Sequence, residues 1–362
     1  MKKKKKAAIG ISGGVDSAVA AALLLEEGYD VIGLTMITDS MPEVVDEARA
    51  TIRELGLDHH IIDLTIPFKN MVVDYFISSY KHGKTPNPCI TCNHNIKFGL
   101  LMTKALELGA EYFATGHYVR LGQDTLTEKK LLLRGVDIGK DQSYFLYRLN
   151  QSQLEKCLFP LGDYTKSQVK AKAKSLGLSS FKKSESQEIC FIPNNDYKKY
   201  IRTNIDPMEI KKGHFLDTEN KIIGSHQGII NYTVGQRRGL GLAFGYPAYV
   251  VSIDSVNNTV KIGKEEDLYN NELISVNNNF IIFDKVDSPL EVEAKIRSTS
   301  VPAAAVLIPC SYDKIRVCFE TPQRAITPGQ SIVYYHGDIL LGGGIIEQAL
   351  YSSIDKKTDA CI

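Results

Sequence analysis

The chain has 362 residues, with 43 Lys and Arg against 42 Asp and Glu, and seven cysteines. At about 150 residues per domain it should hold roughly two to three domains, each able to bury a core without disulfide staples. The formal charge of +1 excludes bulk basic charge as a means of binding nucleic acid, so any such footprint must be local.

The first residues resemble neither a secretory signal nor a membrane anchor. The lysine run 2–6 precedes an apolar stretch that is too short for a signal peptide, and nowhere do about 18 apolar residues run together. We therefore expect a soluble, cytoplasmic protein with no membrane partner, whose cysteines are mostly thiols. The lysine run itself is interpreted as a solvated, frayed terminus.

The pattern of the sequence changes near residue 205. Before it, short β-branched runs alternate with helical patterns such as 42–55 and 96–108, which predicts a parallel sheet flanked by helices. After it, apolar and polar residues alternate between turn residues, which is typical of all-β modules. We predict an α/β domain at 1–205, a small β-rich central or linker domain at 206–275, a β-barrel domain at 276–350 and a flexible tail at 351–362.

The stretch "AAIGISGGVDSAVAAALLLEEGYDVIGLTM" predicts a strand at 7–11, a loop, a helix at 17–27 and a second strand. Gly13 and Gly14 allow the backbone to approach a ligand closely, so that N–H groups and the helix N-terminus converge on an anion such as phosphate. The loop has no GK[ST] ending and does not match GxGxxG. A glycine-rich turn without a ligand is the structural alternative.

The stretch "TPNPCITCNHN" places Cys89 and Cys92 in a CxxC after two prolines. This spacing alone is compatible with a metal site, a redox disulfide or a single nucleophile. A structural zinc is disfavoured because no second CxxC and no HxxxH supplies further ligands.

Three other stretches contain polar groups that could serve function or structure. Gly116 and His117 in "AEYFATGHYVR" follow a predicted strand, where parallel sheets place ligand contacts. The set Lys140, Asp141 and Gln142 precedes an aromatic run, and Cys190 lies in "SESQEICFIP". The structural alternatives are a locally bonded histidine, a helix N-terminus and a buried, inert cysteine.

The motif SGGVDS resembles the PP-loop of the ATP pyrophosphatases. Together with TPNPCxxCN, ATGHYVR, GKDQSYFLY, SQEICFIP, GQRRGLG and TPGQ, which occur in one order, it makes nearly the whole chain similar to the tRNA-specific 2-thiouridylases. This resemblance implies an adenine nucleotide α-hydrolase-like parallel sheet, a β-rich central domain and a C-terminal β-barrel. It also implies ATP as cosubstrate and tRNA and a persulfide donor protein as partners.

The implied reaction replaces the C2 oxygen of the wobble uridine in tRNAs for Lys, Glu and Gln with sulfur. ATP would adenylate this oxygen, which makes it a leaving group, and Asp16 is placed to hold Mg²⁺ against the pyrophosphate. By motif position, the ATP site is lined by Gly10, Ile11, Ser12, Gly13, Gly14, Val15, Asp16, Ser17, Met36 and Gly116.

The resemblance further implies that Cys190 carries a persulfide. Cys92 would attack this persulfide, releasing hydrosulfide and leaving a transient Cys92–Cys190 disulfide, or would attack the activated base; the sequence leaves both routes open. Asn87, Pro88 and Cys89 are the expected contacts to the target base. Some family members have Asp at the matching position, and the Cys89 thiol of this chain could take an acid–base role there only with a perturbed pKa. Cys89, Cys92 and Cys190 could instead ligate a [4Fe–4S] cluster.

The implied tRNA contacts are His117, Lys140, Asp141, Gln142, Arg297 and Gln330, and the motif GQRRGLG adds Arg237 and Arg238. The arginine pair could equally be solvated loop charges. Two rival functions remain on the sequence alone: a PP-loop amide-forming ligase, which would need no paired cysteines, and a non-catalytic tRNA-binding protein.

Overall fold

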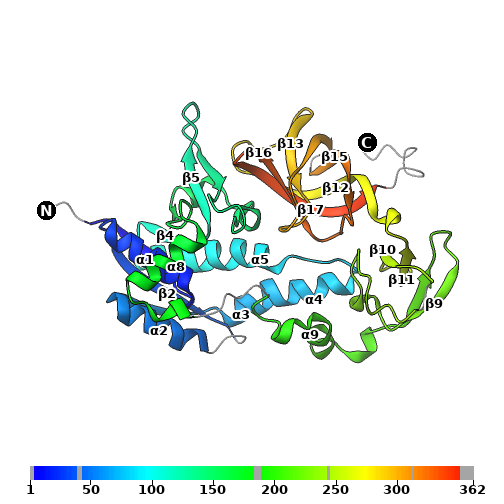
Figure 1. Ribbon diagram of the computed structural model, residues 1–362, viewed down its shortest axis with the longest axis horizontal. Coiled ribbons are helices and arrows are strands. Elements are labelled where there is room, and N and C mark those ends of the chain that lie inside the picture. The colour runs from blue at the N-terminus through cyan, green and yellow to red at the C-terminus, as the bar shows by residue number, and fades with distance from the viewer. Residues whose placement is uncertain (1–3, 39–42, 183–188, 243–244, 312, 351–362) are drawn as a thin grey trace.

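The computed structural model describes residues 4–38, 43–182, 189–242, 245–311 and 313–350. Three β-sheets follow one another along the chain, and Figure 1 shows the parallel sheet with its helices at one end and the two β modules at the other. The predicted fold class is therefore confirmed. The expected tail at 351–362 lies outside the described residues.

The N-terminal sheet is parallel and has the strand order β3 (Asp58–Asp63), β2 (Asp30–Ile37), β1 (Lys6–Gly10), β4 (Tyr112–Ala114) and β7 (Cys157–Leu158). The central strand is an uninterrupted apolar run, and Ala7, Ala8 and Ile9 have no exposed surface. Such runs form strands that are buried on both faces. The sheet therefore directs the carboxyl ends of β1, β2 and β4 to one edge, where the candidate site lies.

Helices cover both faces of this sheet. One core contains Ile9 and residues of α1 (Val15–Glu26), α2 (Glu43–Leu55) and α8 (Lys166–Ser175). The other contains Ala8 and residues of a second group of helices: α3 (Thr65–Phe68), η1 (Lys69–Val73), α4 (Asp74–Lys81), α5 (Pro88–Thr91), η2 (Cys92–Leu101) and α6 (Met102–Glu107). Shorter helices complete the region: η3 (Ser143–Leu146), α7 (Gln151–Leu154), η4 (Ser179–Lys182), η5 (Pro193–Asn195), α9 (Tyr197–Thr203) and η6 (Pro207–Glu209).

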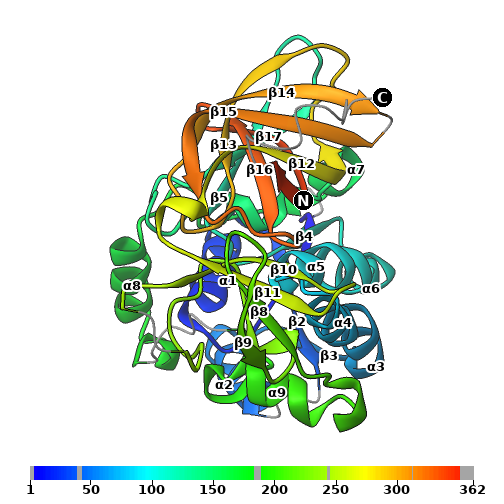
Figure 2. The ribbon, with the colours of Figure 1, turned by 90° about the vertical axis from the view of Figure 1, so that its right-hand side faces the viewer.

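The central module is a four-stranded sheet in the order β10 (Tyr249–Asp254), β11 (Thr259–Gly263), β8 (Gly213–Leu216) and β9 (Ile222–His226). Its core is small and is formed around Phe215, Val250 and Val260. Two short turns flank these strands, η7 (Ile229–Asn231) and η8 (Glu266–Leu268). Figure 2 shows this module beneath the C-terminal strands and beside the helices of the first region.

The C-terminal strands are antiparallel and run in the order β12 (Tyr269–Phe280), β15 (Lys314–Arg324), β14 (Ala303–Ser311), β13 (Leu290–Lys295), β16 (Ser331–His336) and β17 (Ile339–Leu350). The pairing of β12 with β17 closes these six strands into a barrel. A hairpin from the first region, β5 (Val119–Gln123) and β6 (Lys130–Arg134), joins the edge through Leu133 and Ile339. The predicted boundary at 275 falls within β12, and the domain boundaries stay a prediction.

None of the helices in the described ranges is long and apolar enough to cross a bilayer.

Candidate active site

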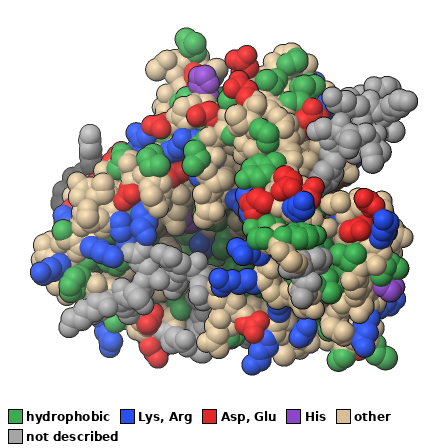
Figure 3. All heavy atoms as spheres, turned by 45° about the vertical axis from the view of Figure 1, so that its right-hand side comes forward, with side chains coloured by type: hydrophobic (Ala, Val, Ile, Leu, Met, Phe, Trp, Pro, Cys, Tyr) green, Lys and Arg blue, Asp and Glu red, His purple; other side chains and the backbone are tan. Residues whose placement is uncertain are grey.

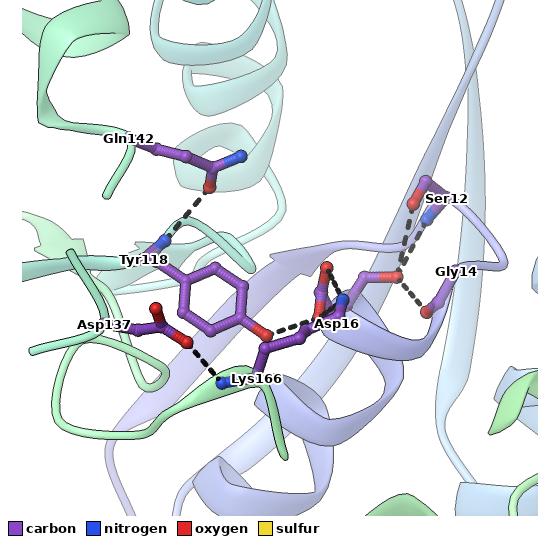
Figure 4. Close-up of polar contacts among 8 residues, drawn as sticks. Ser12, Gly14, Asp16, Tyr118, Asp137, Gln142 and Lys166 are labelled. Atoms are coloured by element: carbon purple, nitrogen blue, oxygen red, sulfur yellow. Dashed lines mark hydrogen bonds and ion pairs between the residues drawn. The ribbon is translucent and has the colours of Figure 1, made fainter. Parts of the chain in front are cut away.

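The loop between β1 and α1 is built to hold an anion. Gly13 has φ +74°, and Gly14 precedes α1 without any side chain capping the helix. The first N–H groups of a helix lack intrahelical partners and bind anions readily. The Ser17 hydroxyl donates to the Gly14 carbonyl at 3.0 Å and accepts from Ser12 N–H at 3.3 Å, which fixes the loop (Figure 4).

The loop after β4 packs directly against this anion site. A Cβ on Gly116 would lie 3.0 Å from the carbonyl carbon of Asp16, so only glycine allows the two backbones to approach this closely. The Tyr118 hydroxyl donates to Asp16 Oδ1 at 2.7 Å. Met36 is half-buried near the end of β2, the strand beside β1. The predicted ATP residues from β1, α1, β2 and the loop after β4 therefore gather at one edge of the sheet.

A lysine that sequence reasoning missed occupies this site. Lys166 Nζ lies 2.7 and 2.8 Å from the two carboxylate oxygens of Asp16, and Lys166 is only 7% exposed. It is the first residue of α8, where a positive charge opposes the helix dipole. That unfavourable position, directly after the N-cap Thr165, is the one sequence signal that could have drawn attention to it.

The TPNPC segment starts α5, with Asn87 as the N-cap residue. The Asn87 side chain accepts a hydrogen bond from Cys89 N–H at 3.2 Å, and Pro88 occupies the first helical position. Cys89 and Cys92 then lie one turn apart, with Cys89 exposed and Cys92 buried. Cys190 is exposed and, like the other two, is a free thiol in this structure.

Lys97 is the cation that acts on these three thiols. Cys89 and Cys190 reach the surface, but the protein atoms packed around them remove part of their solvation, which raises the pKa of each thiol. Burial raises the pKa of Cys92 to about 12, whereas the Lys97 ammonium lowers the pKa of all three thiols. Lys97 lies in η2, a π-helix whose hydrogen bonds run i→i+5, so it follows Cys92 by one turn. Cys190 also interacts electrostatically with both other thiols. The structure thus brings the three cysteines and one lysine together.

His117 connects the two halves of the site. It follows Gly116, which touches the anion loop, and its ring packs against Phe98 of η2 at 5.9 Å and Phe159 at 6.4 Å. Its Nδ1 and the Thr115 hydroxyl are 2.7 Å apart. Burial, with a smaller contribution from Lys97, lowers the pKa of His117 well below its usual value, which keeps the ring neutral. The loop between β1 and α1 and the helix that begins at Cys92 are therefore joined by the segment 115–118.

Two predicted tRNA contacts have side chains bonded within the chain. The Asp141 carboxylate accepts from Ser143 Oγ at 2.8 Å, from Ser143 N–H at 3.1 Å and from Gly135 N–H at 3.2 Å. Gln142 accepts from Tyr118 N–H through Oε1 at 3.0 Å (Figure 4). Gln142 thereby braces the loop after β4, whereas Asp141 ties its own loop to Gly135, the residue that follows β6.

Two more predicted tRNA contacts belong to the barrel. Gln330 Nε2 donates to the Thr85 carbonyl at 2.9 Å and the Pro86 carbonyl at 3.4 Å, which ties the barrel to the TPNPC segment. Arg297 donates to the Ala325 carbonyl and the Thr327 hydroxyl, both at 2.7 Å. Burial lowers the pKa of Arg297.

The remaining predicted tRNA contacts, Lys140, Arg237 and Arg238, are accessible to solvent. Arg237 and Arg238 are exposed, and Lys140 is half-exposed. Figure 3 shows Lys and Arg side chains gathered around the hollow in the middle of one face, between the regions described above. Basic side chains therefore gather locally on this face although the net charge of the chain is near zero.

Two predictions concern a metal, a cluster on the three cysteines and Mg²⁺ on Asp16. Within the ranges that the structure describes, no three His, Cys, Asp or Glu residues are arranged so that they could together hold a metal ion. Asp16 offers one carboxylate, and Mg²⁺ commonly uses one or two carboxylates together with substrate phosphates. Asp16 fits that role provided that Lys166 releases it.

Comparison with known proteins identifies three family profiles along the chain. They are described as the tRNA methyl transferase HUP domain at 5–194, the tRNA methyl transferase PRC-barrel domain at 198–264 and the aminomethyltransferase beta-barrel domain at 270–346.

Two relatives that match over nearly their full length have names that differ from the descriptions of these profiles. The chain is 49% identical to "tRNA-specific 2-thiouridylase MnmA" of Acetivibrio thermocellus, covering 95% of this chain and 99% of that protein. It is 50% identical to "tRNA-specific 2-thiouridylase MnmA 2" of Thermoanaerobacter sp., covering 97% and 100%. Among solved structures, the NMN synthetase of Francisella tularensis is 17% identical, covers 54% of this chain and 72% of its own, and has a TM-score of 0.35, too low to bear on function.

Proposed function

Because this chain belongs to the tRNA-specific 2-thiouridylase MnmA family, we propose that it replaces the C2 oxygen of the wobble uridine with sulfur at the expense of ATP. Its substrates would be tRNAs that read Lys, Glu and Gln codons. The observation that carries the proposal is the segment 115–118, which joins an anion-binding loop to a helix bearing Cys92 and Lys97. An amide-forming ligase would have no use for the thiols.

The first step activates the base. The uridine O2 attacks the α-phosphorus of ATP, the bond from that phosphorus to the β-phosphate oxygen breaks, and pyrophosphate leaves. The uncapped N–H groups of α1 and the backbone around Gly13 stabilise the phosphate charge. Mg²⁺, when bound, would neutralise the pyrophosphate, with Asp16 as its protein ligand.

The second step delivers sulfur from a persulfide on Cys190. The Cys92 thiolate attacks Cys190 Sγ, a Cys92–Cys190 disulfide forms, and the terminal sulfur leaves as hydrosulfide. The hydrosulfide adds to C2, and AMP departs with the former O2. An external dithiol must then reduce the Cys92–Cys190 disulfide. Only after that can the donor protein transfer a new persulfide sulfur to Cys190 for the next turnover.

Lys97 supplies the charge that this thiol chemistry requires. Burial alone would keep all three thiols protonated near neutral pH, and a thiolate is the reactive form. Lys97 has no hydrogen-bond or ion-pair partner among the described residues, so its ammonium remains available to stabilise a thiolate, a persulfide anion or hydrosulfide.

The target base would enter beside Asn87, Pro88 and Cys89. Enzymes that act on a base within folded RNA need it splayed out of its stack, and the anticodon loop can present it so. Lys140, Arg237 and Arg238 would bind phosphates. Five further residues are proposed to contact tRNA through side-chain donors or acceptors that their hydrogen bonds within the chain do not use: His117, Asp141, Gln142, Arg297 and Gln330. For Gln142, this atom is the amide nitrogen, because only Oε1 is bonded to Tyr118.

Single substitutions Cys92→Ser and Cys190→Ser test the proposal, with Cys318→Ser in the barrel as the matched control. We expect both site variants to lose 2-thiouridine, measured by mass spectrometry of digested tRNA, while tRNA-dependent exchange of pyrophosphate into ATP continues. The control should retain both activities. Thiolation that persists in both site variants would refute the sulfur route.

A further inference from the structure

Lys166 is a buried cation whose backbone is held in place by hydrogen bonds at the start of α8. It begins α8 after Thr165, whose side chain caps the helix in a reciprocal pair with Gln168. The Lys166 N–H donates to Asp137 Oδ2 at 2.9 Å (Figure 4). The backbone thus cannot swing away, whereas the side chain retains its rotatable bonds and can redirect its ammonium over a short distance.

The ammonium of Lys166 lies between the Asp16 carboxylate and the Tyr118 ring. It lies 2.7 and 2.8 Å from the carboxylate oxygens of Asp16 and 5.7 Å from the centre of the Tyr118 ring. Tyr118 also donates its hydroxyl to the same carboxylate at 2.7 Å. Asp16 is therefore neutralised in this structure, and both of its oxygens are occupied.

Stability alone does not account for this pair. Removing two charges from water costs about as much as their attraction returns, so buried ion pairs are seldom a net gain over apolar residues. The pair also lies at the helix N-terminus where phosphates are expected to bind. The location points to a role in ligand binding.

The loop itself lacks a cation for the outer phosphates. Phosphate-binding loops that end in GK[ST] aim their own lysine at the β- and γ-phosphates, and SGGVDS contains none. An unneutralised Asp16 would instead repel a triphosphate. A lysine delivered from α8, which lies 150 positions further along the chain, meets both needs.

We propose that Lys166 is a catalytic residue that exchanges partners when the nucleotide binds. In this structure it neutralises Asp16. When a triphosphate binds with a divalent cation, Asp16 would serve as a ligand of that cation, and Lys166 binds the β- and γ-phosphate oxygens and then the departing pyrophosphate. This inference deepens the proposed function and rests on its use of ATP.

Binding measurements on Lys166→Gln test the proposal directly. We expect its affinity for α,β-methylene-ATP with Mg²⁺ and for inorganic pyrophosphate to fall about ten- to hundredfold, as for a lost charge-assisted bond. Affinity for AMP, which lacks the outer phosphates, should change less than twofold. Isothermal titration calorimetry gives all three values.

Lys172→Gln is the matched control, because Lys172 also lies on α8 and pairs with Glu26 of α1 at 2.8 Å on the surface. It should bind all three ligands like the parent chain. Lys166→Arg keeps the positive charge and should recover part of the pyrophosphate affinity. This variant also keeps the inference testable if Lys166→Gln does not fold.

Equal losses for AMP and for the triphosphate analogue would show a purely structural role and overturn the inference, as would unchanged pyrophosphate binding. The proposed function fails separately: a parent chain that shows the expected binding pattern but never thiolates tRNA would leave the inference standing and remove the thiolation proposal.

Discussion

Single residues set the chemistry of this site through burial and one nearby charge. The pKa of Cys92 is raised to about 12, chiefly by burial, and Lys97 is the group that opposes this effect on all three thiols. Because the pKa values lie above neutral, the thiolate fraction rises as pH increases and falls about tenfold for each pH unit below the pKa.

Replacing Lys97 with Gln should therefore slow alkylation of the exposed thiols Cys89 and Cys190 by iodoacetamide. The loss of the ammonium raises their pKa values further, so the profile of rate against pH should move to higher pH. Mass spectrometry of peptides after timed alkylation between pH 7 and about 10 measures this. Lys104→Gln, on the exposed surface of α6, is the control; identical profiles for the two variants would contradict the role of Lys97.

Lys97 and Lys166 show why part of the site could not be predicted from the sequence. An α-helix after Cys92 would turn Lys97 to another face, and nothing in "CNHNIKFG" indicates a π-helix. Lys166 is far from Asp16 in sequence, and "TKSQVKAKAKS" is typical of an ordinary capped helix. Motif matching found the anion loop and the cysteines because their spacing is local, whereas both lysines depend on tertiary contacts.

At the scale of elements, the loop after β4 contacts both the N-terminus of α1 and the helix η2 that begins at Cys92. The prediction of a helix at 17–27 was late by two residues, because Gly14 takes the N-cap position and α1 begins at Val15. The strand predicted at 7–11 and the second strand predicted after the helix are both present, as β1 and β2, since buried parallel strands are apolar runs. Close backbone packing between Gly116 and α1 was not predictable, because no sequence pattern encodes it.

Gly116→Ala should weaken nucleotide binding. Its Cβ would lie 3.0 Å from backbone atoms of Asp16 and Ser17, so the anion loop would have to shift. We expect at least tenfold weaker binding of α,β-methylene-ATP and a loss of about 1–3 kcal/mol in the free energy of unfolding. Gly139→Ala is the control, because its Cβ would meet only Asp137 Oδ1 at 3.5 Å. Unchanged nucleotide affinity in Gly116→Ala would show that this contact does not shape the site.

Gln330 should act by holding the cysteine segment in place. Replacing it with Met removes the hydrogen bonds to the Thr85 and Pro86 carbonyls, which should cost about 1–2 kcal/mol of stability and slow sulfur transfer. Pyrophosphate exchange should stay close to the parent rate, because the anion loop is untouched. Gln323→Met, which bonds only within the barrel, is the control. Lost tRNA affinity with unchanged stability would indicate instead that Gln330 serves as a direct tRNA contact.

At the scale of the whole molecule, a chain of almost zero net charge can attract a polyanion only where its basic side chains gather locally. The change in sequence pattern near residue 205 anticipated the order of an α/β region and two β modules, because helical and strand periodicities differ. It did not predict the hairpin β5–β6, which extends the barrel from the first region. Long-range pairings of this kind leave no local signature.

Binding of tRNA should weaken steeply with salt. Each phosphate contact releases counterions, so the logarithm of the affinity falls linearly with the logarithm of salt concentration. The double substitution Arg237→Gln with Arg238→Gln should reduce that slope by about one to two. Lys221→Gln, on an exposed turn of the central module, should leave it unchanged. A slope unaffected by the double substitution would remove the arginine pair from the tRNA surface.

The most direct test of base activation follows the oxygen that sulfur replaces. A tRNA transcribed with [2-¹⁸O]uridine is incubated with the protein, ATP, Mg²⁺ and a persulfide donor, and AMP is analysed by mass spectrometry. We predict one ¹⁸O in AMP for each 2-thiouridine formed, with unlabelled pyrophosphate. Unlabelled AMP accompanying 2-thiouridine would contradict adenylation of the base.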